Sequence, residues 1–325
     1  MVHITRRGLA AAALLLPAAP AVVRAQGWPS GTIRIVAPFP PGGSVDALAR
    51  LAQPGLEQRL GTTVIVENRP GASGSVGANA VAKAPADGNS WLFVFDTHAV
   101  NPSLIPNLPF DPVKDLAPVT LIGTAPMVLT AHPSQPYRTL ADVIAASKGG
   151  AGPVAYGSIG NGSLGHLAMT QLGKRADARF NHIPYRGGGP LINDAIGGHV
   201  PLAIASVAVL APQLTAGTVR PLVQTGASRV ATLPDVPTVA ESGFPGFEAN
   251  AWWAVFAPAA TPEPVIDRFR RELVAVFSEE RVRRQLAETQ QITLALGSPA
   301  ELRAFFQNQM QTWGAVVREN AIRAD

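Results

Sequence analysis

Three loops rich in glycine and serine offer the clearest chemistry in this sequence. Residues 40–44, 70–74 and 158–163 each follow a β-rich run and precede a stretch with helical spacing. Such a loop places unpaired backbone N–H groups at the positive end of a helix, where they attract an anion such as a carboxylate. Any one of these loops is better explained as a sharp turn capped by serine. Three of them together predict an anion-binding site.

Patterns that would indicate an enzyme are incomplete. Residues 160–165 match G-x-G-x-x-G, but residues 178–193 contain no acid to bind the ribose of a dinucleotide. Ser44, Ser73 and Ser163 each lack one of the two glycines of a G-x-S-x-G nucleophile turn. The six histidines include no pair at metal-ligand spacing, and the chain has no cysteine. We therefore expect no catalytic centre, no bound metal and no cofactor.

The N-terminus resembles an export signal in its order of segments. Arg6 and Arg7 precede an apolar stretch, residues 8–23, and Val-Arg-Ala at residues 23–25 is a small-residue cleavage pattern. The apolar stretch has 16 residues and two prolines, which is too short and too interrupted for a membrane anchor. We predict cleavage after Ala25 and location in the periplasm. The paired arginines fit a twin-arginine signal as well as an ordinary secretory one.

The charge of the mature chain excludes one class of partner. Removing residues 1–25 takes away three of the 26 Lys and Arg and none of the 22 Asp and Glu, so the formal net charge falls from +4 to +1. A nucleic-acid-binding surface needs clustered Lys and Arg to neutralise phosphates. We expect no nucleic-acid partner. Without cysteines, an exported fold is held by core burial and not by disulfides.

Strand-like and helical stretches alternate along the mature chain. Expected strands are residues 32–37, 63–67, 91–95, 154–157, 180–185, 202–206 and 220–225, and expected helices are 44–60, 75–83, 139–147, 163–174, 190–196, a helix near 211, 262–277 and 299–320. This alternation predicts a parallel sheet covered by helices on both faces. Residues 121–130 and 251–257 would cross between two α/β lobes, with small-molecule contacts at the carboxyl ends of the strands.

Five sequence blocks carry a resemblance to a known family. They are APFPPGGSVDALAR (37–50), VENRPGASG (66–74), the block from Tyr156 to Leu167, IPYRGGGP (183–190) and LPDVPTVAESG (233–243). In this order and behind an export signal, they resemble the Bug-type substrate-binding receptors of tripartite tricarboxylate transporters. The resemblance covers essentially the whole mature chain.

The resemblance implies a fold and a function. The fold is α/β, a two-lobed periplasmic binding protein fold of type II-like organisation with a ligand cleft between the lobes. Lobe 1 would comprise residues 26–125 and 251–325, and lobe 2 residues 126–250. The protein would be a monomeric receptor, not an enzyme, that captures a small carboxylate and delivers it to membrane transporter subunits. A sensor that presents its ligand to a membrane sensor kinase is the alternative, because both roles need only a surface that closes on the ligand.

Ligand-binding residues carry over from the family by position. They are Phe39, Pro41, Gly42, Gly43, Asp46, Gly71, Ala72, Ser73, Thr97, His98, Ser158, Gly160, Gly162, Ser163, His166, Tyr185, Arg186 and Ser206. Some members that bind amino acids carry an aspartate where this chain has Ser206, a departure that weakens the case for amine recognition there. Arg186 is the one cation beside a proposed contact, either as a ligand partner or as a solvated loop residue.

Overall fold

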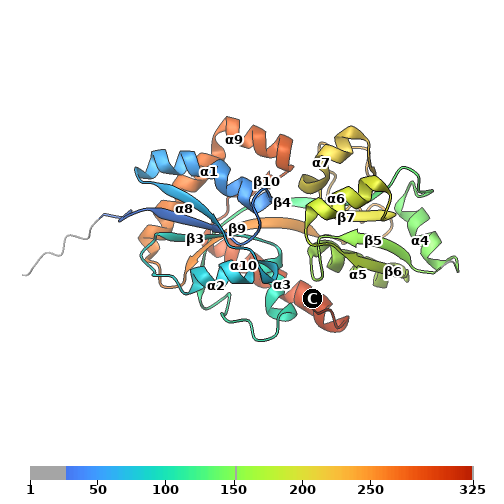
Figure 1. Ribbon diagram of the computed structural model, residues 1–325, viewed down its shortest axis with the longest axis horizontal. Helices are drawn as coiled ribbons and strands as arrows, with labels where there is room; N and C mark the ends of the chain where they lie inside the picture. The colour runs from blue at the N-terminus through green and yellow to red at the C-terminus, as the bar shows by residue number, and fades with distance from the viewer. Residues whose placement is uncertain (1–26, 151, 324–325) are drawn as a thin grey trace, which may run out of the picture.

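The computed structural model describes residues 27–150 and 152–323, so the predicted export signal and the cleavage after Ala25 lie outside the described residues. Two groups of strands and helices lie side by side, and two long strands run between them (Figure 1). These strands are β4 (Leu116–Ala131) and β9 (Asn250–Pro258). They occupy the region where the sequence predicts the two crossing segments.

The remaining elements follow the predicted alternation closely. The other strands are β1 (Ile33–Ala37), β2 (Val64–Asn68), β3 (Ser90–Phe95), β5 (Val154–Ser158), β6 (Phe180–Pro184), β7 (Leu202–Ser206), β8 (Arg220–Gln224) and β10 (Thr293–Leu294). The helices are α1 (Ser44–Leu60), α2 (Ser75–Ala82), α3 (Thr97–Leu104), α4 (Leu140–Lys148), α5 (Leu164–Ala176), α6 (Gly188–Gly197), α7 (Val207–Ala216), α8 (Glu263–Ser278), α9 (Glu280–Gln285) and α10 (Pro299–Glu319), with short turns η1 (Ala72–Gly74) and η2 (Leu286–Gln290). The predicted strands and helices are confirmed, whereas α3, α9 and the two-residue strand β10 were not expected.

The sheet is mixed, so the prediction of a parallel sheet is wrong for its centre. The strand order is β2-β1-β3-β9-β4-β7-β5-β6. At one side β1 pairs in parallel with β2 and β3, and at the other β5 pairs in parallel with β6 and β7. Between them β9 runs antiparallel to β3 and β4, and β4 runs antiparallel to β7. Two antiparallel connecting strands need no helical crossover between them.

Strand β4 changes partners part-way along its length. Its residues from Leu116 to Pro126 pair with β9, and those from Met127 to Ala131 pair with β7 and β8. The change falls beside the predicted lobe boundary at residue 126. The two lobes as units that move relative to each other stay a prediction.

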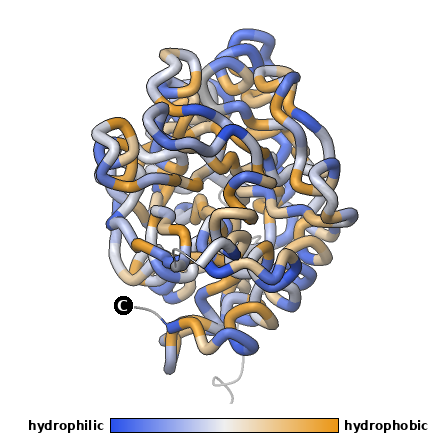
Figure 2. Tube along the Cα trace, turned by 90° about the vertical axis from the view of Figure 1, so that its right-hand side faces the viewer, coloured by the Kyte–Doolittle hydropathy of each residue, from blue (hydrophilic) through white to orange (hydrophobic). Residues whose placement is uncertain are grey.

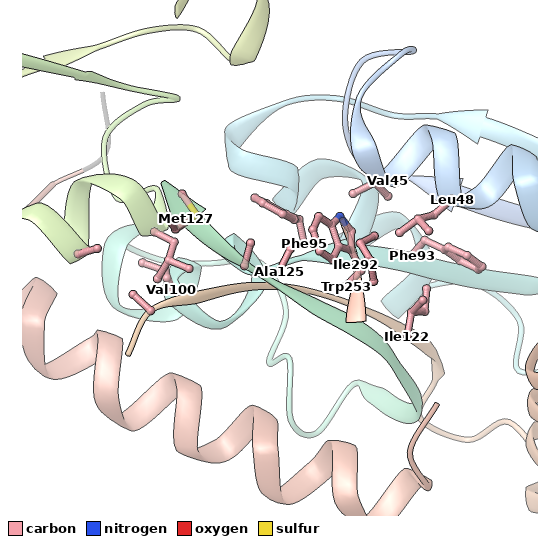
Figure 3. Packing of buried hydrophobic residues seen from close by; sticks show 14 of the residues in the cluster. Val45, Leu48, Phe93, Phe95, Val100, Ile122, Ala125, Met127, Trp253 and Ile292 are labelled. Atoms are coloured by element: carbon pink, nitrogen blue, oxygen red, sulfur yellow. The ribbon is translucent and has the colours of Figure 1, made fainter. Parts of the chain in front are cut away.

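A continuous hydrophobic core underlies the junction of the two groups. In Figure 3, Phe93 and Phe95 from β3, Ile122 and Met127 from β4, and Trp253 from β9 pack in one region. Trp253 is fully buried, and its ring centroid lies 5.3 Å from that of Phe95. Burial of these large side chains stabilises the base on which the loops between strands and helices rest.

None of the helices in residues 27–150 and 152–323 is long and apolar enough to span a membrane. Figure 2 shows hydrophobic and hydrophilic stretches alternating along the chain, as expected where each helix buries one face.

Candidate ligand-binding site

Asp46 organises the first loop of the predicted site. Its buried carboxylate accepts hydrogen bonds from the Gly42 backbone N–H at 2.9 Å, from Asn68 Nδ2 at 2.9 Å and from Arg50 Nε at 3.0 Å. Burial alone would raise the pKa of Asp46, but the bonds from Arg50, Gly42 and Asn68 hold it below its usual value. These bonds show that Asp46 positions the loop, and its predicted contact with a ligand stays a prediction.

The start of α1 supplies the hydrogen-bond donors that this loop leaves open. Gly42 has a φ of 83°, and its backbone N–H donates to the Asp46 carboxylate. Among the described residues, no group accepts a hydrogen bond from the backbone amides of Ser44 and Val45. Trp253 Nε1 donates to Ser44 Oγ at 3.0 Å and so links strand β9 to this helix end. Free amides at a helix N-terminus favour an anion. Ser44 belongs to the loop that the sequence predicts as anion-binding, at residues 40–44.

The other predicted members of this loop surround the same helix end. Pro41, Gly42 and Gly43 are exposed, and Gly43 is the residue before the first turn of α1. The Phe39 ring packs edge-on against Phe95 at 6.4 Å, while the Phe39 carbonyl accepts from Asn68 Nδ2 at 3.1 Å. The structure groups these residues at one strand end, and their contact with a ligand stays a prediction.

The second loop is held in an unusual backbone conformation. Residues 71–74 have φ values of 135°, 43°, 52° and 88° in succession, and two of them, Ala72 and Ser73, are not glycine. Left-handed conformations cost non-glycine residues about 1–2 kcal/mol each and persist where the surroundings enforce them. Here Thr97 Oγ1 and Asn101 Nδ2 both donate to the Ser73 carbonyl, at 3.2 and 3.0 Å. Thr97 thus braces the exposed turn through Ser73.

His98 lies in an aromatic part of the core, and its contact with a ligand stays a prediction. Its side chain is buried, with ring centroids of Phe256, Phe306 and Phe110 at 5.2, 5.3 and 6.2 Å. Burial lowers the pKa of His98 to about 3. On helix α3 the His98 side chain points into the aromatic core, whereas Thr97, the residue before it, bonds to the turn at residues 71–74.

We expect replacement of His98 by phenylalanine to remove part of the acid sensitivity of the fold. A histidine whose pKa is about 3 in the folded protein and 6.5 when unfolded favours unfolding as the pH falls from about 6.5 toward 3. By this linkage His98 costs about 2 kcal/mol of stability on going from pH 7 to pH 5. Urea unfolding at both pH values measures the loss, which should shrink in His98→Phe and persist in a control at exposed His199, His199→Phe. An unchanged loss in the first variant would contradict the burial argument.

Asp96 is a buried acid that the sequence analysis missed. It precedes α3, is 1% exposed, and neither carboxylate oxygen has a hydrogen-bond partner from a side chain in the described ranges. Burial raises its pKa well above the usual value, against the effect of the Thr97 backbone amide. The available signal was an acid directly after a strand of continuous apolarity.

Ser158 organises the loop after β5, which lies in the group of elements that contains β5, β6 and β7. The buried Ser158 Oγ donates to the Gly160 carbonyl at 3.1 Å, and lies 3.1 Å from Ser163 Oγ and 2.7 Å from His182 Nε2. Ser163 caps α5, since its Oγ accepts from the His166 backbone N–H at 3.4 Å. The structure therefore brings together four residues of the predicted site, namely Ser158, Gly160, Ser163 and His166. It adds His182, which the sequence analysis did not include.

At Gly162 the loop after β5 lies against the end of helix α3. Its φ is 69°, and its N–H donates to His166 Nδ1 at 3.1 Å. A Cβ built on Gly162 would lie 2.3 Å from Leu104 Cδ2 at the end of α3. Only a glycine allows this close approach without displacement of one partner. The amide of Gly162, like that of Gly42, is used within the protein, so the prediction that glycine amides themselves hold the ligand is not supported in this conformation.

The last three predicted residues differ in their surroundings. Tyr185 donates its hydroxyl to Asp194 Oδ2 at 2.8 Å, and burial together with Asp194 raises the pKa of Tyr185 to about 12. Arg186 is exposed. Ser206 precedes α7, and its buried Oγ has no partner among the described residues. Ser206 therefore has an open hydrogen-bonding position beside a helix N-terminus, whereas the hydroxyl proton of Tyr185 is already donated to Asp194.

A separate groove of about 360 Å³ lies between α5 and α10, outside the predicted site. Lys174 and Glu319 form an ion pair of 2.8 Å beside it, and both side chains are exposed. The polar residues that line it are exposed or only half-buried, so it lacks the buried polar groups that fix a ligand.

A comparison with protein families decides between the possible classes. The family described as the tripartite tricarboxylate transporter family receptor matches residues 48–322. The chain belongs to this family. It is a family of binding receptors and not of enzymes, which confirms both the predicted resemblance and the absence of catalysis from the predicted function.

Solved structures of similar proteins confirm the fold of this receptor. The periplasmic binding protein BugD is 30% identical, covers 92% of this chain and 100% of its own, and has a TM-score of 0.81. Rpa4515 of Rhodopseudomonas palustris, solved with adipate, is 31% identical over 91% of this chain and 99% of its own, with a TM-score of 0.83. MatC from the same organism, solved with bound malate, is 29% identical over 89% and 99%, with a TM-score of 0.80. The receptor therefore has the α/β periplasmic binding protein fold.

Proposed function

We propose that this receptor captures a small dicarboxylate in the periplasm and delivers it to membrane subunits of a tripartite tricarboxylate-type transporter. The observation that carries the proposal is the open amides of Ser44 and Val45 at the N-terminus of α1, in a loop that has no free cation. Dipolar donors of this kind suit a carboxylate. The adipate and malate in the structures of two relatives support the same ligand class.

The proposed movement is closure of two lobes, residues 26–125 with 251–325 and residues 126–250, about β4 and β9. The approach of Gly162 to Leu104 supports contact between the lobes at the site. In this proposal the ligand meets the open amides of α1, the exposed turn at residues 71–73 and the Ser206 hydroxyl. The mature chain would begin at Gln26 after export and act as a monomer.

The test is a titration of the chain from residue 26 onward with adipate, malate and the uncharged dimethyl adipate. We expect calorimetry to detect one of the diacids and no binding of the diester, because helix-end amides select for charge. X-ray scattering should show a smaller radius of gyration when the diacid saturates the protein, since a ligand that bridges two lobes favours the closed state. Failure of both diacids to bind, or equal binding of the diester, would contradict the proposal.

A further inference from the structure

Two histidines stack against each other directly behind the second-lobe loop. The ring of His182, on the edge strand β6, lies 3.8 Å from that of His166, on α5, with 15° between the planes. Each ring also bonds to the loop at residues 158–163. His182 Nε2 lies 2.7 Å from Ser158 Oγ, and His166 Nδ1 accepts from the Gly162 N–H at 3.1 Å.

The direction of these hydrogen bonds depends on where Ser158 places its one hydroxyl proton. Three atoms near Ser158 Oγ could accept it, namely Gly160 O at 3.1 Å, Ser163 Oγ at 3.1 Å and His182 Nε2 at 2.7 Å. We assign it to the Gly160 carbonyl, which can only accept, and the contact with His182 then places a proton on His182 Nε2. His166 Nδ1 accepts from Gly162, so the proton of the neutral His166 ring is on Nε2. With this assignment both rings are neutral and both of their bonds to the loop are satisfied.

The surroundings favour neutral rings. Burial, and secondarily the neighbouring His166, lowers the pKa of His182 to about 3. The titratable groups that face His182 are His166 from α5 and Tyr156 from β5, whose ring centroid lies 5.2 Å away. No carboxylate contributes to the shift of His182. At neutral pH the His182 ring is therefore uncharged.

We propose that His182 and His166 are positioning residues that hold residues 158–163 in the ligand-binding conformation through Ser158 and Gly162. His166 thereby acts behind the loop and not as the ligand contact expected from the sequence. The inference rests on the proposed function only in that this loop meets the ligand. The bracing itself depends on the contacts of the described residues.

Two variants of His182 separate its hydrogen bond from its ring stacking. His182→Phe keeps a ring against His166 and removes the donor to Ser158, whereas His182→Gln can place an amide near the position of Nε2. His132→Phe is a matched control, because His132 Nδ1 makes a 2.7 Å contact with Ser134 Oγ on an exposed segment. Mass spectrometry of hydrogen exchange should show about tenfold faster exchange in residues 159–163 of the Phe variant, with near wild-type rates in the Gln variant and the control.

Nitrogen NMR of the histidine rings provides a readout that a purely structural role would not change. We expect His182 of the wild-type protein to carry its proton on Nε2 and not to titrate between pH 5 and pH 8. Titration within that range, or unchanged loop exchange in His182→Phe, would overturn the brace. With adipate as the probe, binding should weaken about tenfold in His182→Phe and recover in His182→Gln.

Two outcomes with adipate have different meanings. Equal affinity of wild type and His182→Phe, despite faster loop exchange, would overturn the link between the brace and binding. Failure of the wild type to bind any diacid would overturn the proposed function, while the exchange and NMR results would still decide whether the histidines brace the loop.

Discussion

Replacement of Gly162 by alanine should weaken binding of the preferred diacid by about ten- to a hundredfold. The new Cβ would lie 2.3 Å from Leu104 Cδ2, so Leu104 or the loop at residues 158–163 would have to move from its present position. Inserting a methyl group into a contact this tight typically costs about 1–3 kcal/mol. Calorimetric titration measures the loss, and scattering should show that the variant with ligand is less compact than the wild type with ligand.

Two further variants separate the clash from backbone strain. Gly217 has a φ of 67°, close to the 69° of Gly162, but an added Cβ there meets no atom within 4 Å. Gly217→Ala should therefore lower stability by about 1 kcal/mol without changing affinity. Shortening the opposing side chain in Gly162→Ala/Leu104→Ala should recover much of the lost binding. Undiminished affinity in Gly162→Ala alone would show that the two segments need not approach when ligand binds.

Replacement of Asp46 by alanine should lower both stability and affinity. It removes the acceptor of three donors, namely Gly42 N, Asn68 Nδ2 and Arg50 Nε. The Gly42 N–H then loses its partner, and Asn68 Nδ2 keeps only its bond to the Phe39 carbonyl. We expect the free energy of unfolding to fall by about 2–4 kcal/mol. The ion pair with Arg50 contributes little to this loss, because the Arg50 side chain is half exposed and solvent screens its charge. Binding of the diacid should weaken at least tenfold. Denaturant unfolding and calorimetry measure the two effects.

Asp142 provides a matched control for Asp46. Its carboxylate also accepts two backbone N–H groups, from Arg138 and Thr139, but it does so at the start of α4. Asp142→Ala should lower stability through loss of the helix cap and leave diacid binding unchanged. If Asp46→Ala bound the diacid as tightly as this control, the loop at residues 39–46 would not depend on its internal carboxylate.

Local properties of the chain were predictable from short stretches of sequence. The alternation of strands and helices needs only apolar spacing and breakers, and it is confirmed for nearly all elements. Positive φ values at Gly42, Gly160 and Gly162 agree with the expectation that these loops need glycine. Helix α3 was missed because its eight residues, with an internal proline at Pro102, lack a strong helical pattern.

The roles of individual side chains were less predictable, because their partners are distant in sequence. Asp46 was expected to face a ligand, but Asn68, 22 residues away, lies beside it once β1 and β2 pair. His182 reaches Ser158 only because β5 and β6 pair in parallel with Ser158 opposite Pro184. A sequence shows neither strand register nor the direction in which a helix turns His98.

The amino-acid sequence by itself determined the elements, the glycine-bearing loops at their junctions and the family to which the receptor belongs, because each depends on residues close together in the chain. The tertiary structure decided the antiparallel course of β4 and β9, the burial of His98 and Asp96, and the use of Asp46, Ser158 and His182 within the protein. These features depend on which segments become neighbours when the common core is buried. The physical reason is that hydrogen-bond satisfaction and burial are properties of the packed chain and not of any one segment.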